Sequence, residues 1–187
     1  MNTGKLCVFT AGGKMHQIKV LDLPHGKFRD KGLPIDNVSN YDSTAEEIVY
    51  ICDAEQTRYA KLLFATKQGM IKKVDGQEFQ VAKRTIAATK LQADDAVVSI
   101  QVITDNQQVV LQTKDGYFLR FSAQEVAEKK KAAVGVRGIK LRKNDELEQI
   151  YLFYEGTEHK ISYGDRELTL NRLKVAKRDG TGTKARS

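Results

Sequence analysis

Short apolar runs alternate with polar turns along the chain, and one hairpin-like pattern occurs three times. The copies are "LCVFTAGGKMHQI" (6–18), "LLFATKQGMIKKV" (62–74) and "VVLQTKDGYFLRF" (109–121). In each copy a threonine follows an apolar run, and a glycine lies three positions after the threonine. Glycine accepts the left-handed backbone that closes a short loop, so each copy predicts a β-hairpin.

The second half of each hairpin alternates apolar and polar residues. Gln17, Lys73 and Arg120 are the polar or basic residues that interrupt the apolar ones at corresponding positions. A period of two is typical of a strand with one buried face, so we expect these side chains on the other face.

Two further elements recur after each hairpin. A short segment appears as "GLPI" (32–35), "ATKL" (88–91) and "GIKL" (138–141), and a long apolar run with acidic residues at its start appears at 46–54, 95–105 and 146–156. A shorter fourth copy begins at "KISYGDRELTL" (160–170). Such repeats predict an all-β array of radial blades or a solenoid, with about four four-stranded units at 5–57, 58–106, 107–157 and a degenerate 158–187. WD repeats are disfavoured because the chain has no tryptophan. The one helical stretch expected is 122–133, with a length of only a turn or two.

The composition is typical of a soluble globular protein, and basic residues outnumber acidic ones. The chain has 187 residues and a net charge of +7, which admits a nucleic acid or another acidic surface as partner. Cys7 and Cys52 lie in apolar runs and are expected to be reduced and buried. The sequence shows neither a signal-peptide pattern nor an apolar run near the ~18 residues of a membrane span, so we expect a single cytoplasmic domain.

The positive charge gathers in the segments that connect each hairpin to the next long strand. These cations are Lys27, Arg29 and Lys31; Lys83 and Arg84; Lys129, Lys130, Lys131, Arg137, Lys140 and Arg142; and, in the tail, Lys177, Arg178, Lys184 and Arg186. If the blades are related by rotation, these segments fall on one rim and form a cationic belt for phosphates. Gly135 and Gly138 would bring backbone amides close to those phosphates. The alternatives are loops that only keep the blade edges soluble, or a rim that binds an acidic partner protein.

The hairpin "VVLQTKDGYFLRF", with "GVRGIKL" (135–141) at a fixed offset, resembles the C-terminal DNA-wrapping domain of bacterial type IIA topoisomerase A subunits, found in DNA gyrase and topoisomerase IV. The resemblance implies a β-pinwheel that binds and bends duplex DNA on its outer rim. The implied partners, in the bacterial nucleoid, are DNA, the ATPase B subunit of the parent enzyme and the catalytic core of its A subunit. The isolated domain is expected to be a monomer.

The chain departs from the gyrase pattern in one motif. Gyrase A subunits carry the heptapeptide Q-R-R-G-G-[RK]-G, and here only "GKFRDKG" (26–32) and "KRDGTGTK" (177–184) resemble it loosely. This departure favours a topoisomerase IV-like role over full supercoiling by wrapping. The alternative function from another class is a propeller-like protein-interaction module.

No catalytic or cofactor motif stands out. Arg58 and Tyr59 resemble the arginine–tyrosine pair with which the parent enzymes attack DNA, but Tyr59 precedes a repeat strand and is expected to pack on a blade. His16, His25 and His159 lack partners at metal-binding spacing. We therefore expect that the chain alone is not an enzyme and needs neither a metal nor a cofactor.

Overall fold

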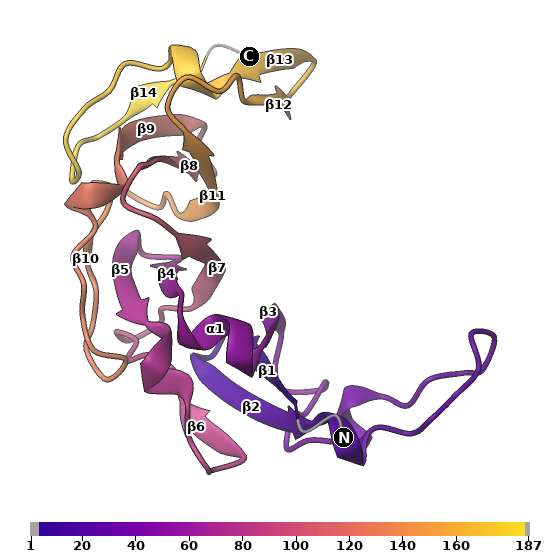
Figure 1. Ribbon diagram of the computed structural model, residues 1–187. Coiled ribbons are helices and arrows are strands. Elements are labelled where there is room, and N and C mark those ends of the chain that lie inside the picture. Colours follow the sequence, from indigo (N-terminus) through magenta and orange to yellow (C-terminus); the bar gives the residue numbers. More distant parts are fainter. Residues whose placement is uncertain (1–3, 186–187) are drawn as a thin grey trace.

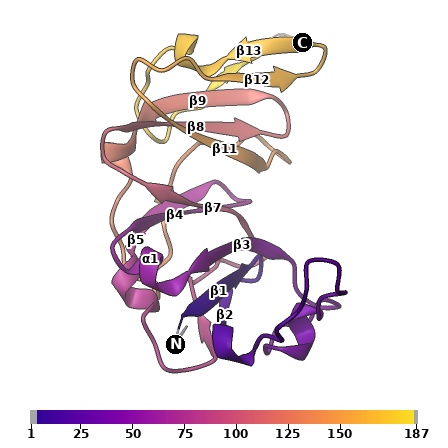
Figure 2. The same ribbon diagram turned by 45° about the vertical axis from the view of Figure 1, so that its right-hand side comes forward.

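The protein is an open arc of small β-sheets that follow one another along the chain (Figure 1). A computed structural model describes residues 4–185. Three sheets have four strands each, and β12–β13 forms a two-stranded hairpin. All strand pairs are antiparallel. Figure 2 shows this hairpin stacked on the third sheet. The all-β prediction is confirmed, and the last unit, predicted to be degenerate, has a sheet of two strands.

Each four-stranded sheet has the same order, with a repeat hairpin in its middle. The first sheet is β3 (Ile48–Asp53), β1 (Lys5–Thr10), β2 (Lys14–Lys19) and β6 (Thr85–Ala87). The second is β7 (Val97–Ile103), β4 (Lys61–Thr66), β5 (Met70–Asp75) and β10 (Val136–Arg137). The third is β11 (Leu147–Tyr154), β8 (Gln107–Thr113), β9 (Tyr117–Ser122) and β14 (Thr183–Lys184). The last hairpin is β12 (Lys160–Tyr163) and β13 (Arg166–Thr169).

The outermost strand of each four-stranded sheet comes from the next repeat. β6 follows β5 in the chain and pairs with β2, β10 follows β9 and pairs with β5, and β14 follows β13 and pairs with β9. The last repeat thus gives its short strand to the third sheet, which explains why its own sheet has two strands. The repeat boundaries stay a prediction, because each four-stranded sheet draws one strand from beyond them.

The strands β2, β5 and β9 are buried on both faces, so the prediction of one buried face is wrong. Gln17, Lys73 and Arg120 are 8%, 5% and 7% exposed. Both faces are covered because neighbouring sheets pack face to face. Each polar side chain donates to a backbone carbonyl of the following repeat: Gln17 to Val81 (3.0 Å), Lys73 to Ala123 (3.4 Å) and Arg120 to Asn171 (2.6 Å).

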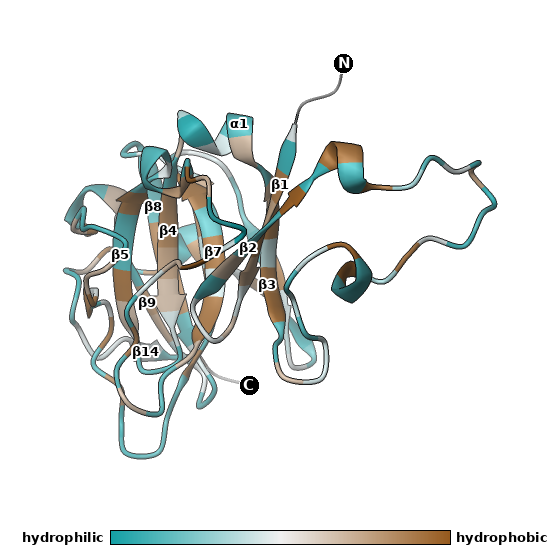
Figure 3. Cartoon of the chain, turned by 90° about the horizontal axis from the view of Figure 1, so that it is seen from below, coloured by the Kyte–Doolittle hydropathy of each residue, from teal (hydrophilic) through white to brown (hydrophobic). Residues whose placement is uncertain are grey.

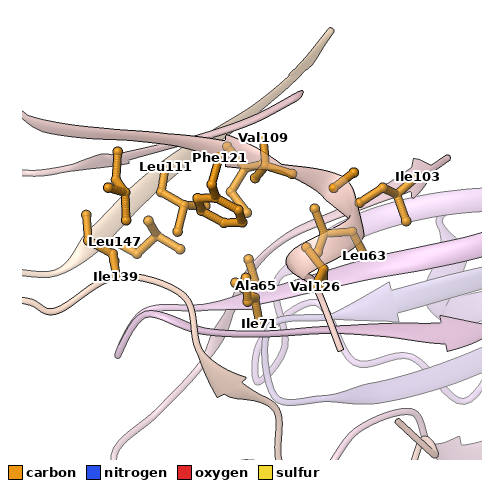
Figure 4. Packing of buried hydrophobic residues seen from close by; sticks show 13 residues of the cluster. Leu63, Ala65, Ile71, Ile103, Val109, Leu111, Phe121, Val126, Ile139 and Leu147 are labelled. Atoms are coloured by element: carbon orange, nitrogen blue, oxygen red, sulfur yellow. The ribbon is translucent and has the colours of Figure 1, made fainter. Parts of the chain in front are cut away.

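The hydrophobic core is divided into layers between successive sheets. The layer between the second and third sheets packs Leu63 and Ile71 of one sheet against Leu111 and Phe121 of the other (Figure 4). Ile139, from the segment that carries β10, lies in the same layer and is fully buried. Similar clusters centre on Phe64 and Phe79 between the first two sheets and on Phe118 and Phe153 at the last. Burial between sheets therefore fixes the course of the arc.

Helices are short. The α-helix α1 spans Ala54–Arg58 and begins where the Asp53 carboxylate accepts the amides of Glu55 and Gln56. The 3-10 turns are η1 (Val20–Asp22), η2 (Ile35–Asn37), η3 (Gly76–Phe79), η4 (Ala123–Glu125) and η5 (Leu170–Arg172). The short helical stretch predicted within 122–133 is limited to η4, because the chain beyond it runs along β5: Lys73 donates its amide to Ala127 and accepts that of Lys129.

Tyr59 does not pack on a blade as predicted. It ends α1 and is 80% exposed. Cys7 is buried as predicted, whereas Cys52 is only half-buried, and both are free thiols in the structure. Within residues 4–185, no helix combines the length and apolar character that a membrane crossing requires.

Candidate nucleic-acid interface

The outer edge of the arc is formed by three connecting segments, which we name the rim connectors: residues 80–91, 127–143 and 174–185. They contain β6, β10 and β14, the outermost strands of the three sheets. The strands β10 and β14 lie along the convex side in Figure 1, whereas β3, β7 and β11 lie on the inner side. Cations in the rim connectors therefore lie on one side of the arc.

The first two rim connectors meet at a hollow of about 660 Å³. Lys83 and Lys90 from the first connector and Lys131 from the second line it, together with Thr85 and Thr89. Sequence reasoning missed Lys90. The signal was present, because aligning "ATKL" with "GIKL" places Lys90 at the position of Lys140.

The second and third rim connectors are joined directly. The amide of Asp179 donates to the carbonyl of Gly138, and that of Lys140 donates to Gly180, both at 2.8 Å. The Arg137 guanidinium makes two hydrogen bonds to the Asp179 carboxylate, which lower the pKa of that carboxyl. Arg178 adds a bond from its side chain to the carbonyl of Arg137. The three connectors are thus contiguous.

The predicted rim cations divide into exposed and occupied groups. Exposed cations for which residues 4–185 provide no ion pair are Lys83, Lys129, Lys140 and Lys177. Arg84 lies 3.9 Å from Asp22, and Lys130 lies 3.4 Å from Glu78 with its side chain 86% exposed. Arg142 is exposed and stacks on the Tyr117 ring at 4.3 Å, and Lys184 lies over the same ring. Arg137 is the predicted cation most fully neutralised, and Arg186 lies outside the described residues.

The two predicted glycines serve packing within the protein, and the expectation for the Gly138 amide is wrong. This amide donates to the carbonyl of Gly69 at 2.8 Å, so it is already occupied. A Cβ on Gly138 would meet Ile71 and Leu111 side chains at 2.9 Å, and one on Gly135 would lie 2.5 Å from the carbonyl oxygen of Ile71. Both glycines let the second rim connector lie close against β5.

A buried lysine holds the second rim connector in place. Lys72 is 1% exposed, and its ammonium donates to the carbonyls of Lys130 (3.2 Å), Lys131 (2.9 Å) and Ala133 (2.6 Å). Burial lowers its pKa to about 8. Sequence reasoning missed this role, because a lysine in an alternating strand is normally solvated.

The first connecting segment, residues 20–47, contacts the rim only near its ends, where Asp22 lies 3.9 Å from Arg84 and Asn40 donates to Thr85 at 3.2 Å. No sheet precedes β1 within residues 4–185, so this segment has no outer edge to complete, and the part between these contacts projects away from the sheets (Figure 3). Its tip is a turn in which Asp30 accepts the amide of Lys27 and donates its own amide to the Lys27 carbonyl. Phe28 at this turn is fully exposed. Lys27, Arg29 and Lys31 are therefore not brought together with the other predicted cations.

The histidines of the described residues do not gather into a metal-binding group. Among residues 4–185, His, Cys, Asp and Glu side chains form no group of three or more suited to a metal ion. His16 lies between Thr85 (3.0 Å) and Glu46 (2.6 Å) in the first sheet, and His159 stacks on Phe153. His25 is exposed on the projecting segment. The contacts of His16 and His159 therefore belong to the packing of the fold.

Comparison with known proteins matches this arc to one family of β-propeller domains. Residues 60–104 and 107–153 match the family described as DNA gyrase C-terminal domain, beta-propeller. The DNA gyrase A subunit of Lawsonia intracellularis is 30% identical over 185 residues, and that of Chlamydia muridarum is 35% identical over 147 residues. These matches cover 95% and 76% of this chain and 22% and 17% of those relatives, so the chain spans about a fifth of their length.

Solved structures agree with the sequence matches. The C-terminal domain of DNA topoisomerase IV superposes with a TM-score of 0.88 at 25% identity, covering 97% of this chain and 58% of that one. The E. coli ParC C-terminal domain has the same fold, with a TM-score of 0.80 at 20% identity and coverage of 99% and 78%. Together with the repeated hairpins and exchanged strands, these matches show that the chain belongs to the family of DNA gyrase C-terminal beta-propeller domains.

Proposed function

We propose that this chain binds duplex DNA along its rim connectors without sequence preference, as the accessory domain of a type IIA topoisomerase A subunit. The observation that carries the proposal is the contact between successive connectors, which brings Lys83, Lys90 and Lys131 to one hollow and joins Lys140 to Gly180. Exposed cations spaced along a continuous edge release counterions from many phosphates at once.

The curvature of the arc supports bending of the bound duplex. DNA that follows the convex edge in Figure 1 must bend with it. Bending a short site costs on the order of 1–6 kcal/mol, which additional phosphate contacts offset. Phe153 is buried and Tyr151 half-buried in the inner strand β11, which supports binding through phosphates rather than base stacking.

Sequence favours a topoisomerase IV-like role over full supercoiling. The heptapeptide Q-R-R-G-G-[RK]-G is absent from the sequence, and the similar stretch "GKFRDKG" (26–32) lies on the projecting segment, away from the rim. At the nucleoid, the domain would act with the ATPase B subunit of the enzyme and with the catalytic core of its A subunit. The domain would set the path of the bound DNA and would not cleave its backbone. The chain alone should therefore not relax supercoiled plasmid.

Charge reversal on the rim tests binding. Lys83→Glu, Lys129→Glu and Lys140→Glu together should weaken duplex binding and flatten its salt dependence, since log K falls by about 0.9 per neutralised phosphate for each tenfold rise in salt. The matched control is Lys160→Glu in β12, where Glu158 and Glu167 surround the lysine. If the rim variant binds duplex DNA normally but loses a contact with the catalytic core, the rim is a protein-interaction surface and the proposal is wrong.

Wrapping is tested separately from binding. The chain is bound to nicked circular plasmid, the nicks are sealed, and the linking number is measured after the protein is removed. A change in linking number reports a wrap and its sign. An unchanged linking number at saturating protein would contradict wrapping, while the salt-dependence experiment still reports binding.

A further inference from the structure

Two cysteines lie side by side on neighbouring strands of the first sheet. Cys7 on β1 is the direct antiparallel partner of Cys52 on β3. Opposed residues in an antiparallel pair have Cα atoms about 4.5–5.5 Å apart, which lies inside the range that a disulfide bond spans. Both cysteines are free, so the backbone already has a spacing suited to a bond that has not formed.

The hydrogen bonds around the pair give the two sulfur atoms different roles. Cys7 shares a hydrogen bond with Cys52. The hydroxyl of Thr57 lies 3.0 Å from the Cys52 sulfur and shares its proton between this sulfur and the carbonyl of Asp53 at 2.7 Å. The bond from Cys7 is the main cause that lowers the pKa of Cys52, with burial opposing it and Thr57 adding to it. The same bond, together with burial, raises the pKa of Cys7. Of the two thiols, Cys52 is therefore the one that loses its proton more readily.

Nearby charges do not reverse this assignment. Asp53 follows Cys52 and disfavours a second negative charge, but its carboxylate is held by the amides of Glu55 and Gln56 at the start of α1. Lys5, on the same strand as Cys7, lowers the pKa of Cys7, but the bond to Cys52 and burial outweigh this effect. Accessibility also differs, since Cys7 is 0% exposed and Cys52 is half-buried. An oxidant therefore reaches Cys52 first.

We propose that Cys52 is a hydroperoxide-reactive thiol that Cys7 resolves to an intramolecular disulfide. The Cys52 thiolate attacks a peroxide oxygen, the O–O bond breaks, and a sulfenic acid forms with release of hydroxide. The Cys7 sulfur then attacks the Cys52 sulfur, a sulfur–sulfur bond forms, and the hydroxyl leaves as water with the Cys7 proton. Two thiols are oxidised to one disulfide, and one hydrogen peroxide is reduced to two waters.

The Cys7–Cys52 disulfide would close a loop of chain from residue 7 to residue 52. β2 and the projecting segment both lie between Cys7 and Cys52 in the sequence. A disulfide at this place constrains the unfolded chain and should raise the melting temperature of the full chain by several degrees.

The experiment treats the folded 187-residue chain with hydrogen peroxide and counts free thiols in denaturant with a maleimide. Both thiols should disappear together, and digestion should yield one cross-linked peptide pair with a mass loss of two hydrogens. Sulfenic or sulfinic acid without a cross-link in the wild-type chain would overturn the proposal. So would retention of both thiols at peroxide levels that oxidise an exposed thiol peptide.

Matched variants separate the two roles. In Cys7→Ser, Cys52 should stop at a sulfenic acid that dimedone traps, whereas in Cys52→Ser the Cys7 thiol should survive the same treatment. Thr57→Val should slow disulfide formation several-fold because one donor to the thiolate is lost. Equal oxidation of Cys7 in the Cys52→Ser chain, with the fold intact by circular dichroism, would refute the assignment. None of these measurements involves DNA, so their outcome does not depend on the proposed function.

Discussion

The backbone amide of Gly138 donates a hydrogen bond of 2.8 Å to the carbonyl of Gly69, the glycine that closes the β4–β5 hairpin. Ala88 makes the same bond to Gly13 at 2.7 Å, and Ala185 makes it to Gly116 at 2.9 Å. Every hairpin turn within a four-stranded sheet is thus fastened to the connector of the next repeat. Stability in such an array is close to a sum of repeat and nearest-neighbour contributions, so single contacts between repeats carry measurable weight.

Gly135→Ala should destabilise the protein by about 2–3 kcal/mol, because the added Cβ would lie 2.5 Å from the carbonyl oxygen of Ile71 and would push the connector off β5. Gly32→Ala is the matched control. It lies in the first connecting segment, where an added Cβ meets nothing within 4 Å. Urea unfolding of both variants checks this, and equal stability of the two would contradict the packing role given to Gly135.

Sequence periodicity predicts the hairpins and the repeat order well, because each hairpin is built from neighbouring residues. Thr113 and Gly116, with their counterparts, mark every turn correctly, and the glycines have φ angles of 78–80°. Strand exchange could not be predicted in this way. It depends on contacts such as Val136 with Ile71, which are distant in sequence and follow from burying the connector against a neighbouring sheet.

The candidate site could be predicted only in part, for a related reason. A basic connecting segment in sequence does not reveal which sheet it lies on. The pattern therefore groups Lys27 and its neighbours with Lys83, although the segment that carries Lys27 precedes the rim connectors and has no sheet edge to join. Neutralisation of Arg137 also depends on Asp179, 42 residues away. The environments of Lys72 and Arg120 are not predictable from their own strands, because the second buried face comes from a different repeat.

Asp179→Asn should strengthen duplex binding, because the change frees Arg137 from a carboxylate on the rim. The salt dependence of log K should steepen by about 0.9, the contribution of one further phosphate. Asparagine accepts the left-handed backbone at this position, where φ is 67°, so the turn should remain.

Asp165→Asn is the control for the Asp179 variant, since it makes the same charge change in the exposed turn between β12 and β13. Its salt slope should stay that of the wild-type chain. Filter binding or fluorescence anisotropy over a salt series measures both variants. Identical slopes for the two would show that net charge, and not Arg137 on the rim, governs binding.

Arg120→Ala should destabilise the last hairpin more than the rest of the arc. The guanidinium donates to the carbonyls of Asn171 (2.6 Å) and Leu173 (3.2 Å) and lies 5.4 Å from the centre of the Phe153 ring. Loss of these charged hydrogen bonds should cost about 2–3 kcal/mol. Arg166→Ala, an exposed change on β13, should alter stability by less than about 0.5 kcal/mol.

Hydrogen exchange locates the effect of Arg120→Ala. Amides of residues 158–173 should exchange faster than in the wild-type chain, while those of β4 and β5 keep their protection. Uniform acceleration along the whole chain would instead mean that the arc unfolds as one unit, and that Arg120 does not act as a local tether.

Because Lys72 is buried, the free energy of unfolding should increase as the pH rises above about 8. Its folded pKa is about 8 against an ordinary value of 10.5, so between these pH values the unfolded chain binds more protons than the folded chain. The free energy of unfolding therefore rises with pH across this window, by a total on the order of 3 kcal/mol. Below pH 8 the ammonium is charged in the folded chain, and the cost of burying it is fully present.

Lys72→Met should remove the rise. Lys129→Met, the same change at an exposed rim position, should retain it. Urea unfolding at closely spaced pH values measures all three chains. Taking differences between them cancels the titration of tyrosines and thiols that they share. Parallel pH profiles for wild-type and Lys72→Met would mean that the Lys72 ammonium is not buried against the connector carbonyls.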